Sequence, residues 1–114
     1  MARAATTSDV FNAIAEPRRR EILTLLRTGD RPVAQLAVEL GLPQPGASKH
    51  LRVLREVGLV RDRREGKQRV YGLNAGGLRA VHEWTGGFEQ FWNESFARLD
   101  AYVRELSDDR NGEQ

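Results

Sequence analysis

Polar and basic side chains between residues 44 and 56 have the types and spacing needed to recognise nucleic acid. If this stretch is helical, Ala47, Leu51 and Leu54 recur on one face and turn inward. The positions that then project outward, or flank the exposed stripe, carry hydrogen-bonding and cationic groups of the kinds that contact base edges and phosphates. These positions are Gln44, Ser48, Lys49, His50, Arg52 and Arg55.

The two ends of this helix suit different tasks. The N-terminal end of a DNA-recognition helix usually enters the major groove, so residues 44–50 are expected to contact base edges. Arg52 and Arg55 lie further along and are better placed to hold phosphates. His50 lies between the inner and outer faces and could serve on either. On this helix alone, an ordinary solvated face would explain the pattern equally well.

A second basic segment follows, and it favours the nucleic-acid interpretation. Five cations fall within the nine residues 61–69, with only Asp62 and Glu65 opposing them. Residues 59–65 and 68–73 have strand-like composition, and Gly66-Lys67 between them has the form of a two-residue hairpin turn. A hairpin with cations near its tip can lie along a DNA backbone or enter the minor groove. The hairpin candidates for DNA contact are Arg63, Arg64, Lys67 and Arg69.

The elements that must position these groups can be traced by periodicity, proline and glycine. Apolar spacing predicts short helices near residues 10–14 and 17–26, the first capped by Thr6, Thr7 or Ser8. A further helix opens at Pro32 and stops at Gly41, so residues 32–56 form two helices joined by a tight turn. With the hairpin at 59–73, this order predicts a mainly α fold with a small β-hairpin, a winged helix-turn-helix. We expect a single domain over residues 8–106, with flexible termini at 1–7 and 107–114.

The last third of the chain predicts a long helix over residues 78–106, with a kink or break at Gly86-Gly87. Its apolar residues recur at spacings of three and four and include a series of aromatic rings. Such a stripe usually packs against another helix, which favours a dimer contact. The alternative is a pocket for an apolar small-molecule effector, which the sequence does not identify.

Charge and composition narrow the function classes. Residues 1–74 carry 14 Lys and Arg against 8 Asp and Glu, whereas residues 75–114 carry 4 against 8. The basic first part therefore suits an anionic partner. The chain has no Cys, only two His and no glycine-rich phosphate loop, so we expect no enzyme. No apolar run suggests a leader or a membrane span, and the default location is the cytoplasm.

Three stretches of the sequence resemble the ArsR/SmtB family of bacterial repressors: residues 10–23, residues 44–60 and the hairpin residues 64–71. The similarity stays in register over roughly residues 8–106. It implies a homodimeric repressor whose first and last helices form the dimer interface and whose two recognition helices lie in successive major grooves. The residues expected at that interface are Val10, Phe11, Trp84, Phe88, Phe91, Trp92, Phe96, Leu99 and Val103.

The sequence departs from the family pattern in the first turn of the recognition helix. Pro43 stands where many relatives have a Ser or Thr cap, and Gly46 stands where Ala is more usual. A glycine at this position weakens the helix by about 1 kcal/mol relative to alanine. Either a looser helix start or a close approach of the backbone to DNA would account for it.

Many members of the ArsR/SmtB family bind a metal, but the residues that would bind it are missing from this sequence. Residues 32–37 offer no thiolate, and the positions for an Asp-x-His pair and a second His read Ala80, His82 and Asn93. One His is a poor ligand set for zinc, so we expect no metal and no cofactor.

The prediction is a sequence-specific, dimeric regulator that binds an inverted repeat in double-stranded DNA. The alternative is a winged-helix module that docks another protein through its aromatic C-terminal helix.

Overall fold

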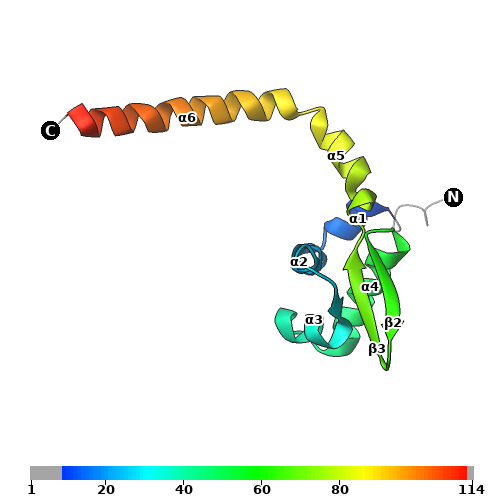
Figure 1. Ribbon diagram of the computed structural model, residues 1–114. Helices are drawn as coiled ribbons and strands as arrows, with labels where there is room; N and C mark the ends of the chain where they lie inside the picture. Colours follow the sequence, from blue (N-terminus) through cyan, green and yellow to red (C-terminus); the bar gives the residue numbers. More distant parts are fainter. Residues whose placement is uncertain (1–8, 113–114) are drawn as a thin grey trace. The chain divides into compact units, whose positions relative to one another are not determined.

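The computed structural model describes residues 9–112, with side chains described as far as residue 108. Its contacts divide the chain into two compact units, Met1–Val81 and His82–Gln114. The element order in Figure 1 is four helices, a small sheet with one strand ahead of the third helix, and two further helices. The first unit is a helical bundle with an antiparallel sheet, as the sequence predicts for a winged helix-turn-helix. The predicted N-terminal segment 1–7 lies outside the described residues.

The first two helices are α1, Val10–Ile14, and α2, Pro17–Leu26. The predicted caps of α1 were wrong, because the side chain of Asp9 accepts a hydrogen bond from the backbone N–H of Asn12 at 2.7 Å. Aspartate is a strong N-cap residue because it satisfies an N–H that has no partner within the helix. Pro17 begins α2 as expected, and the carboxylate of Glu16 caps it by accepting from the N–H of Arg18 at 2.9 Å.

The helix-turn-helix consists of α3, Val33–Leu40, and α4, Gln44–Glu56. Gly41 ends α3 with a φ of +68°, a left-handed conformation that glycine adopts without steric cost. The inner stripe predicted for α4 is confirmed, since Ala47, Leu51 and Leu54 are each fully buried. The largest fully buried side chains of the first unit are Ile22, Leu36, Leu51, Leu54 and Leu59.

The sheet has three antiparallel strands in the order β1-β3-β2. The predicted hairpin is confirmed as β2, Val60–Glu65, and β3, Gln68–Leu73, with Gly66 taking the positive φ of +61° in the turn. Strand β1, Arg31–Pro32, was not predicted from the sequence. Its two residues pair with Tyr71 and Val70 of β3. Pro32 therefore precedes α3 in extended conformation instead of opening it as a helical residue.

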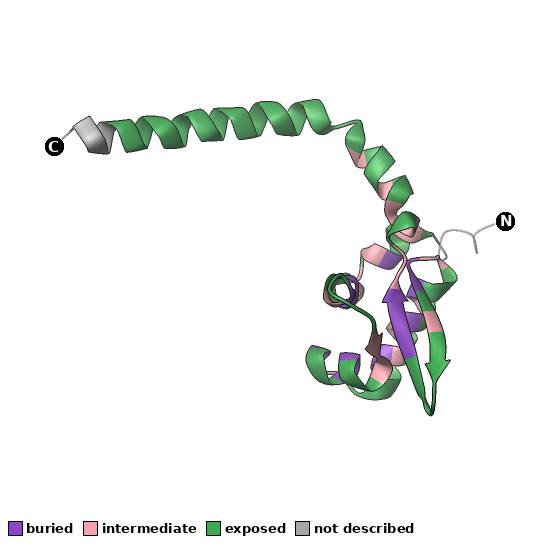
Figure 2. Ribbon diagram, viewed as in Figure 1, coloured by how far each residue is buried: buried purple, intermediate pink, exposed green. Residues whose placement is uncertain are grey.

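A 3-10 turn, Ala75–Leu78, follows the hairpin, and α5 spans Arg79–Gly86. In the second unit, α6 begins at Glu89, so the helix break predicted at Gly86-Gly87 is present. Helix α6 continues to Gly112, past the predicted end at residue 106, because no proline or glycine intervenes before that residue. All residues of α6 with described side chains are exposed in the single chain (Figure 2). No helix among residues 9–112 is long and apolar enough to cross a membrane.

Candidate nucleic-acid and dimer interfaces

The outward face of α4 carries the polar residues predicted to contact DNA. Gln44, Lys49, Arg52 and Arg55 are exposed, and Ser48 is half-buried. Because the opposite stripe is anchored in the core, the helix cannot rotate to hide these groups. A Cβ built on Gly46 would meet no atom within 4 Å, so packing inside the chain does not demand a glycine there.

A groove of about 360 Å³ separates α4 from the sheet, and predicted DNA-contact residues line both of its walls. Ser48, Arg52 and Arg55 come from the helix wall, whereas Arg69 and Tyr71 come from β3 on the other side. Val33 completes the lining. Three guanidinium groups and two hydroxyl groups around one groove form a donor-rich surface of the kind that binds phosphate oxygens.

One carboxylate lies between the cations of this groove. Asp62 accepts hydrogen bonds from Arg69 Nη1 at 2.6 Å and from Arg55 Nη1 at 3.1 Å. Only 13% of its side chain is exposed, against nearly half of either arginine side chain. The hydrogen bond from Arg69, supported by that from Arg55, lowers the pKa of Asp62 and keeps it ionised, although burial opposes this.

The hairpin divides its cations between two faces. Residues opposite one another across the ladder share a face, so Arg64 and its partner Arg69 lie on the same side as Asp62 and Tyr71. Arg63 alternates to the other side, where it pairs with Asp30 at 2.5 Å and with Glu65 at 2.6 Å. The predicted DNA contact Arg63 is therefore already engaged within the chain, and it does not line the groove.

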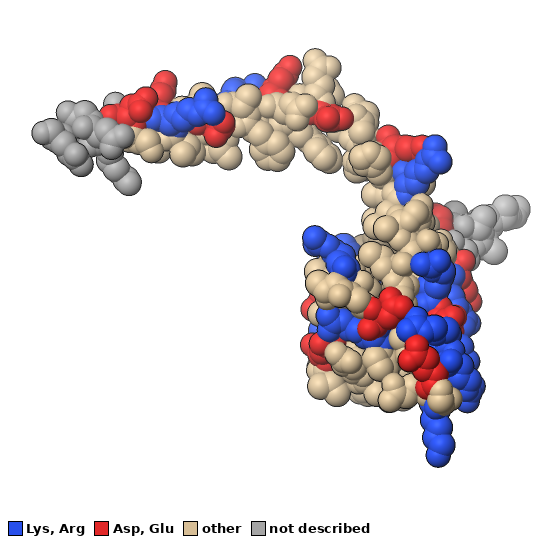
Figure 3. Space-filling view, in the orientation of Figure 1, with Lys and Arg blue, Asp and Glu red and all other residues tan. Residues whose placement is uncertain are grey.

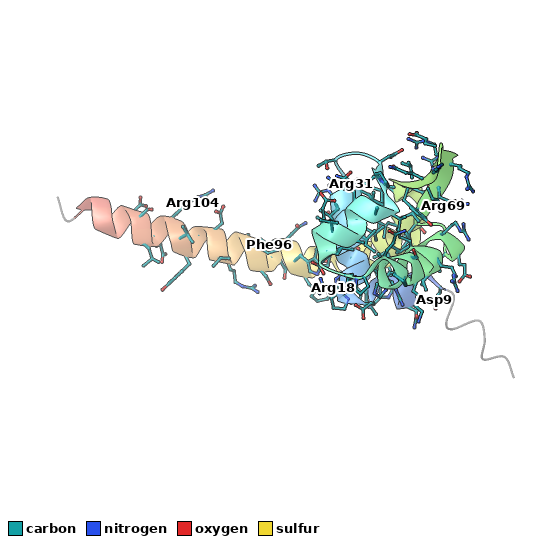
Figure 4. All side chains as sticks on the ribbon, turned by 90° about the horizontal axis from the view of Figure 1, so that it is seen from below. Asp9, Arg18, Arg31, Arg69, Phe96 and Arg104 are labelled. Atoms are coloured by element: carbon teal, nitrogen blue, oxygen red, sulfur yellow. The ribbon has the colours of Figure 1, made fainter. Side chains whose placement is uncertain are left out.

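The remaining predicted cations are available to an external partner. Lys49, Arg52, Arg64 and Lys67 are exposed and form no ion pair within the described part of the chain. Figure 3 shows basic side chains gathered along the edge of the first unit that carries the hairpin and at the hairpin tip. Figure 4 shows Arg69 on the hairpin of the same unit.

His50 has a different setting from its neighbours on α4. Its ring is half-buried, and Nδ1 accepts a hydrogen bond from Arg19 Nε of α2 at 3.4 Å. Burial lowers the pKa of His50, the positive charge of Arg19 lowers it further, and Glu16 opposes the effect. Of the two roles left open by the sequence, these contacts favour attachment to the helical core.

The sequence did not predict Tyr71 as a groove residue, and it predicted for Asp62 only that its negative charge opposes the neighbouring cations. The turn Gly66-Lys67 fixes the register of the hairpin, and that register puts Tyr71 directly opposite Asp62. The pairing could have been obtained from the sequence by counting outward from the turn. The contact of Asp62 with Arg55 could not, because it depends on how α4 packs on β2.

The expected dimer residues form an exposed apolar stripe on α5 and α6. Trp84, Phe91, Phe96 and Leu99 are each about 60% exposed, and Phe96 projects from α6 in Figure 4. From Trp92 to Leu106 the stripe repeats with alternating spacings of four and three residues, the pattern of a two-helix seam. On α1, Phe11 is also exposed, whereas Val10 is half-buried and packs against the core of its own unit.

Comparison with known proteins now identifies the family. Residues 16–62 match the model of the bacterial regulatory protein, arsR family. The transcriptional repressor SdpR of Bacillus subtilis is 35% identical over 77 residues, which cover 68% of this chain and 86% of that protein. The chain belongs to the ArsR family.

Solved structures of ArsR-like regulators share the fold of this family member. One, described as a possible transcriptional regulator for arsenical resistance, is 38% identical with a TM-score of 0.61, over 78% of this chain and 90% of that one. Another is the homodimeric winged helix-turn-helix DNA-binding domain of a possible ArsR-family regulator from Mycobacterium bovis. It is 34% identical with a TM-score of 0.59, over 69% of this chain and 76% of that one.

Possible metal ligands lie apart from one another in the described residues of this ArsR-family chain. Within residues 9–108, whose side chains are described, no three His, Asp or Glu side chains come together in a way that could hold a metal ion. His82 is exposed on α5, and the positions that would complete a site carry Ala80 and Asn93. One imidazole without two further donors is too small a ligand set for zinc.

Proposed function

We propose that this protein is a homodimeric repressor of transcription that binds an inverted-repeat operator in double-stranded DNA. The observation that carries the proposal is the groove between α4 and the hairpin, where Ser48, Arg52, Arg55, Arg69 and Tyr71 converge. In this arrangement α4 enters the major groove, and the hairpin follows the adjacent backbone. Binding of so small a dimer over a promoter would block transcription by occlusion, and the site of action would be the cytoplasm.

Within α4, the division of roles follows position on the helix. Gln44, Ser48 and Lys49 occupy the N-terminal half and are proposed to contact base edges. Arg52 and Arg55, with Arg64, Lys67 and Arg69 of the hairpin, are proposed to hold phosphates. His50 is proposed to orient α4 through Arg19 rather than to read a base.

The dimer is proposed to form through the apolar stripe of α5 and α6 together with Phe11 of α1. A contiguous series of exposed large apolar side chains on a single chain marks an interaction surface. The four-and-three repeat of α6 supports helix-to-helix packing rather than an effector pocket, and a small-molecule effector remains unidentified. Two-fold symmetry then requires two half-sites about one helical turn apart, or ~34 Å.

The test is selection of binding sequences from a pool of randomised duplexes, followed by titration at several salt concentrations. We expect an imperfect inverted repeat and a steep salt dependence, because log K falls by about 0.9 per phosphate neutralised for each tenfold increase in salt. Simultaneous reversal of Arg52, Arg55 and Arg64 to Glu should abolish binding while sedimentation still reports a dimer. Failure to select any sequence, or salt-insensitive binding, would contradict the proposal.

A further inference from the structure

Asp62 is an unexpected residue on a surface that binds a polyanion. Its carboxylate lies beside the groove between α4 and the hairpin, where a DNA phosphate would be repelled by its charge. Among the hairpin residues that form ion pairs in the described part of the chain, it has the least exposed side chain, at 13%. A carboxylate in this place weakens the attraction of the groove for DNA phosphates. Its presence is therefore best explained by a second effect, one that favours operator DNA over random DNA.

The contacts of Asp62 suggest what that contribution is. Its carboxylate joins Arg55 of α4 to Arg69 of β3, at 3.1 Å and 2.6 Å, through one oxygen atom, Oδ2. Both guanidinium groups are thereby fixed on opposite walls of one groove before any DNA arrives. The link also adds a polar connection between the recognition helix and the hairpin, which already pack against each other through α4 and β2.

The net charge of this cluster affects random DNA and operator DNA differently. Arg55, Arg69 and Asp62 together carry a net charge of +1, so two arginines act toward distant phosphates as about one cation. Binding to random DNA depends almost entirely on such charge, whereas operator binding also depends on base contacts held in a fixed register. Neutralising part of the groove therefore weakens random binding more than operator binding.

We propose that Asp62 is a specificity-determining residue, which positions Arg55 and Arg69 for one operator phosphate and reduces the attraction of the groove for random DNA. The inference rests on the proposed function and extends it to one residue. Asp62 acts through the two arginines and not by touching DNA. Without it, the guanidinium groups move freely and neutralise any phosphate within reach.

The experiment compares Asp62→Asn with the wild type on a selected operator duplex and on a random duplex of the same length, by fluorescence anisotropy. At 0.1 M salt we expect random-DNA affinity to rise by up to about eightfold. One further neutralised phosphate adds about 0.9 to log K at 0.1 M relative to 1 M salt. Operator affinity should rise by less, so that the ratio of operator to random affinity falls by about threefold or more. The salt slope on random DNA should steepen by about 0.9.

Glu65→Gln is the matched control, because it removes the same charge from the same strand, while the ion pair of Glu65 is with Arg63 on the other face. It should change both affinities alike and leave their ratio unchanged. Asp62→Thr, which suits a strand, replaces Asp62→Asn if thermal melting shows that the amide variant is unfolded. An unchanged or increased ratio in the Asp62 variants, or the same fall in Glu65→Gln, overturns the inference while leaving operator binding intact. A wild type without sequence preference instead refutes the proposed function, and the inference with it.

Discussion

The side chain of Arg19 joins the end of α1 to the recognition helix, because its Nε donates to Nδ1 of His50 at 3.4 Å while its Nη1 donates to the carbonyl of Ala13 at 3.4 Å. Ala13 is fully buried in α1, the helix that carries Phe11. Arg19 thus connects a helix proposed for dimer contact with the helix proposed for DNA contact. The acceptor role of Nδ1 requires that this nitrogen of His50 carry no proton.

The lowered pKa of His50 predicts that the protein is less stable in mild acid. Since burial and the charges of Arg19 and Arg18 favour the neutral ring in the folded chain, the unfolded chain binds more protons once the pH falls below about 6.5. The free energy of unfolding should therefore be highest above that pH and decrease toward pH 5. Urea titrations at pH 7.5 and 5.5 should show a smaller decrease for His50→Gln, which cannot titrate. An equal decrease in both proteins would assign the pH dependence to other groups.

Gly46→Ala separates the two explanations left open for the glycine in the first turn of α4. Because a Cβ there meets no atom of the chain and helix propensity favours alanine, the free energy of unfolding should rise by about 0.5–1 kcal/mol. We expect operator affinity to fall at the same time, because the added methyl group obstructs a close approach of the helix backbone to DNA. Unfolding and anisotropy titrations of one preparation check both effects. Higher stability with unchanged affinity would mean that the glycine has no role in binding.

Much of this arrangement was predictable from local sequence, and the exceptions have physical reasons. The hairpin and the inner stripe of α4 follow from Gly66-Lys67 and from the spacing of Ala47, Leu51 and Leu54, all of which are local signals. Strand β1 is only two residues long, and it forms by pairing with the free edge of β3. A local sequence pattern does not predict such a pairing. The contacts of Asp62 with Arg55 and of Arg19 with His50 join distant elements, so they emerge only with tertiary packing.

Ser48→Ala tests base reading, because Ser48 lies in the N-terminal half of α4 and lines the groove. Loss of a hydrogen bond to a base edge should cost about 1–3 kcal/mol on the selected operator and relax the preference at one position of each half-site. Binding to random duplexes should stay the same. Repeating the selection with the variant measures the preference directly. A uniform loss on all sequences would reassign Ser48 to phosphate contact.

Arg64→Ala should have the opposite signature. Arg64 is exposed on the hairpin face shared with Arg69 and forms no ion pair with the side chains described for residues 9–108, so its charge is available to phosphate. Its removal should weaken binding to all sequences similarly and lower the salt slope by about one unit. Arg98→Ala removes the same charge from α6, for which no DNA contact is proposed, and it should leave the slope unchanged. A sequence-dependent loss in Arg64→Ala would instead indicate contact with bases.

Trp92→Ala tests the proposed dimer surface. Trp92 begins the four-and-three repeat of α6 and is 46% exposed in the single chain, so a partner helix would bury much of its ring. Truncating a buried Trp typically costs about 3–5 kcal/mol, and this raises the dimer dissociation constant by about 100-fold or more. Sedimentation equilibrium measures the constant, with Glu94→Ala as the control on the same helix but outside the repeat. Because each subunit of the dimer supplies one α4, operator affinity should fall in parallel with dimerisation in Trp92→Ala. A variant that remains fully dimeric would move the interface away from α6 and toward α1, where Phe11 is the exposed apolar residue.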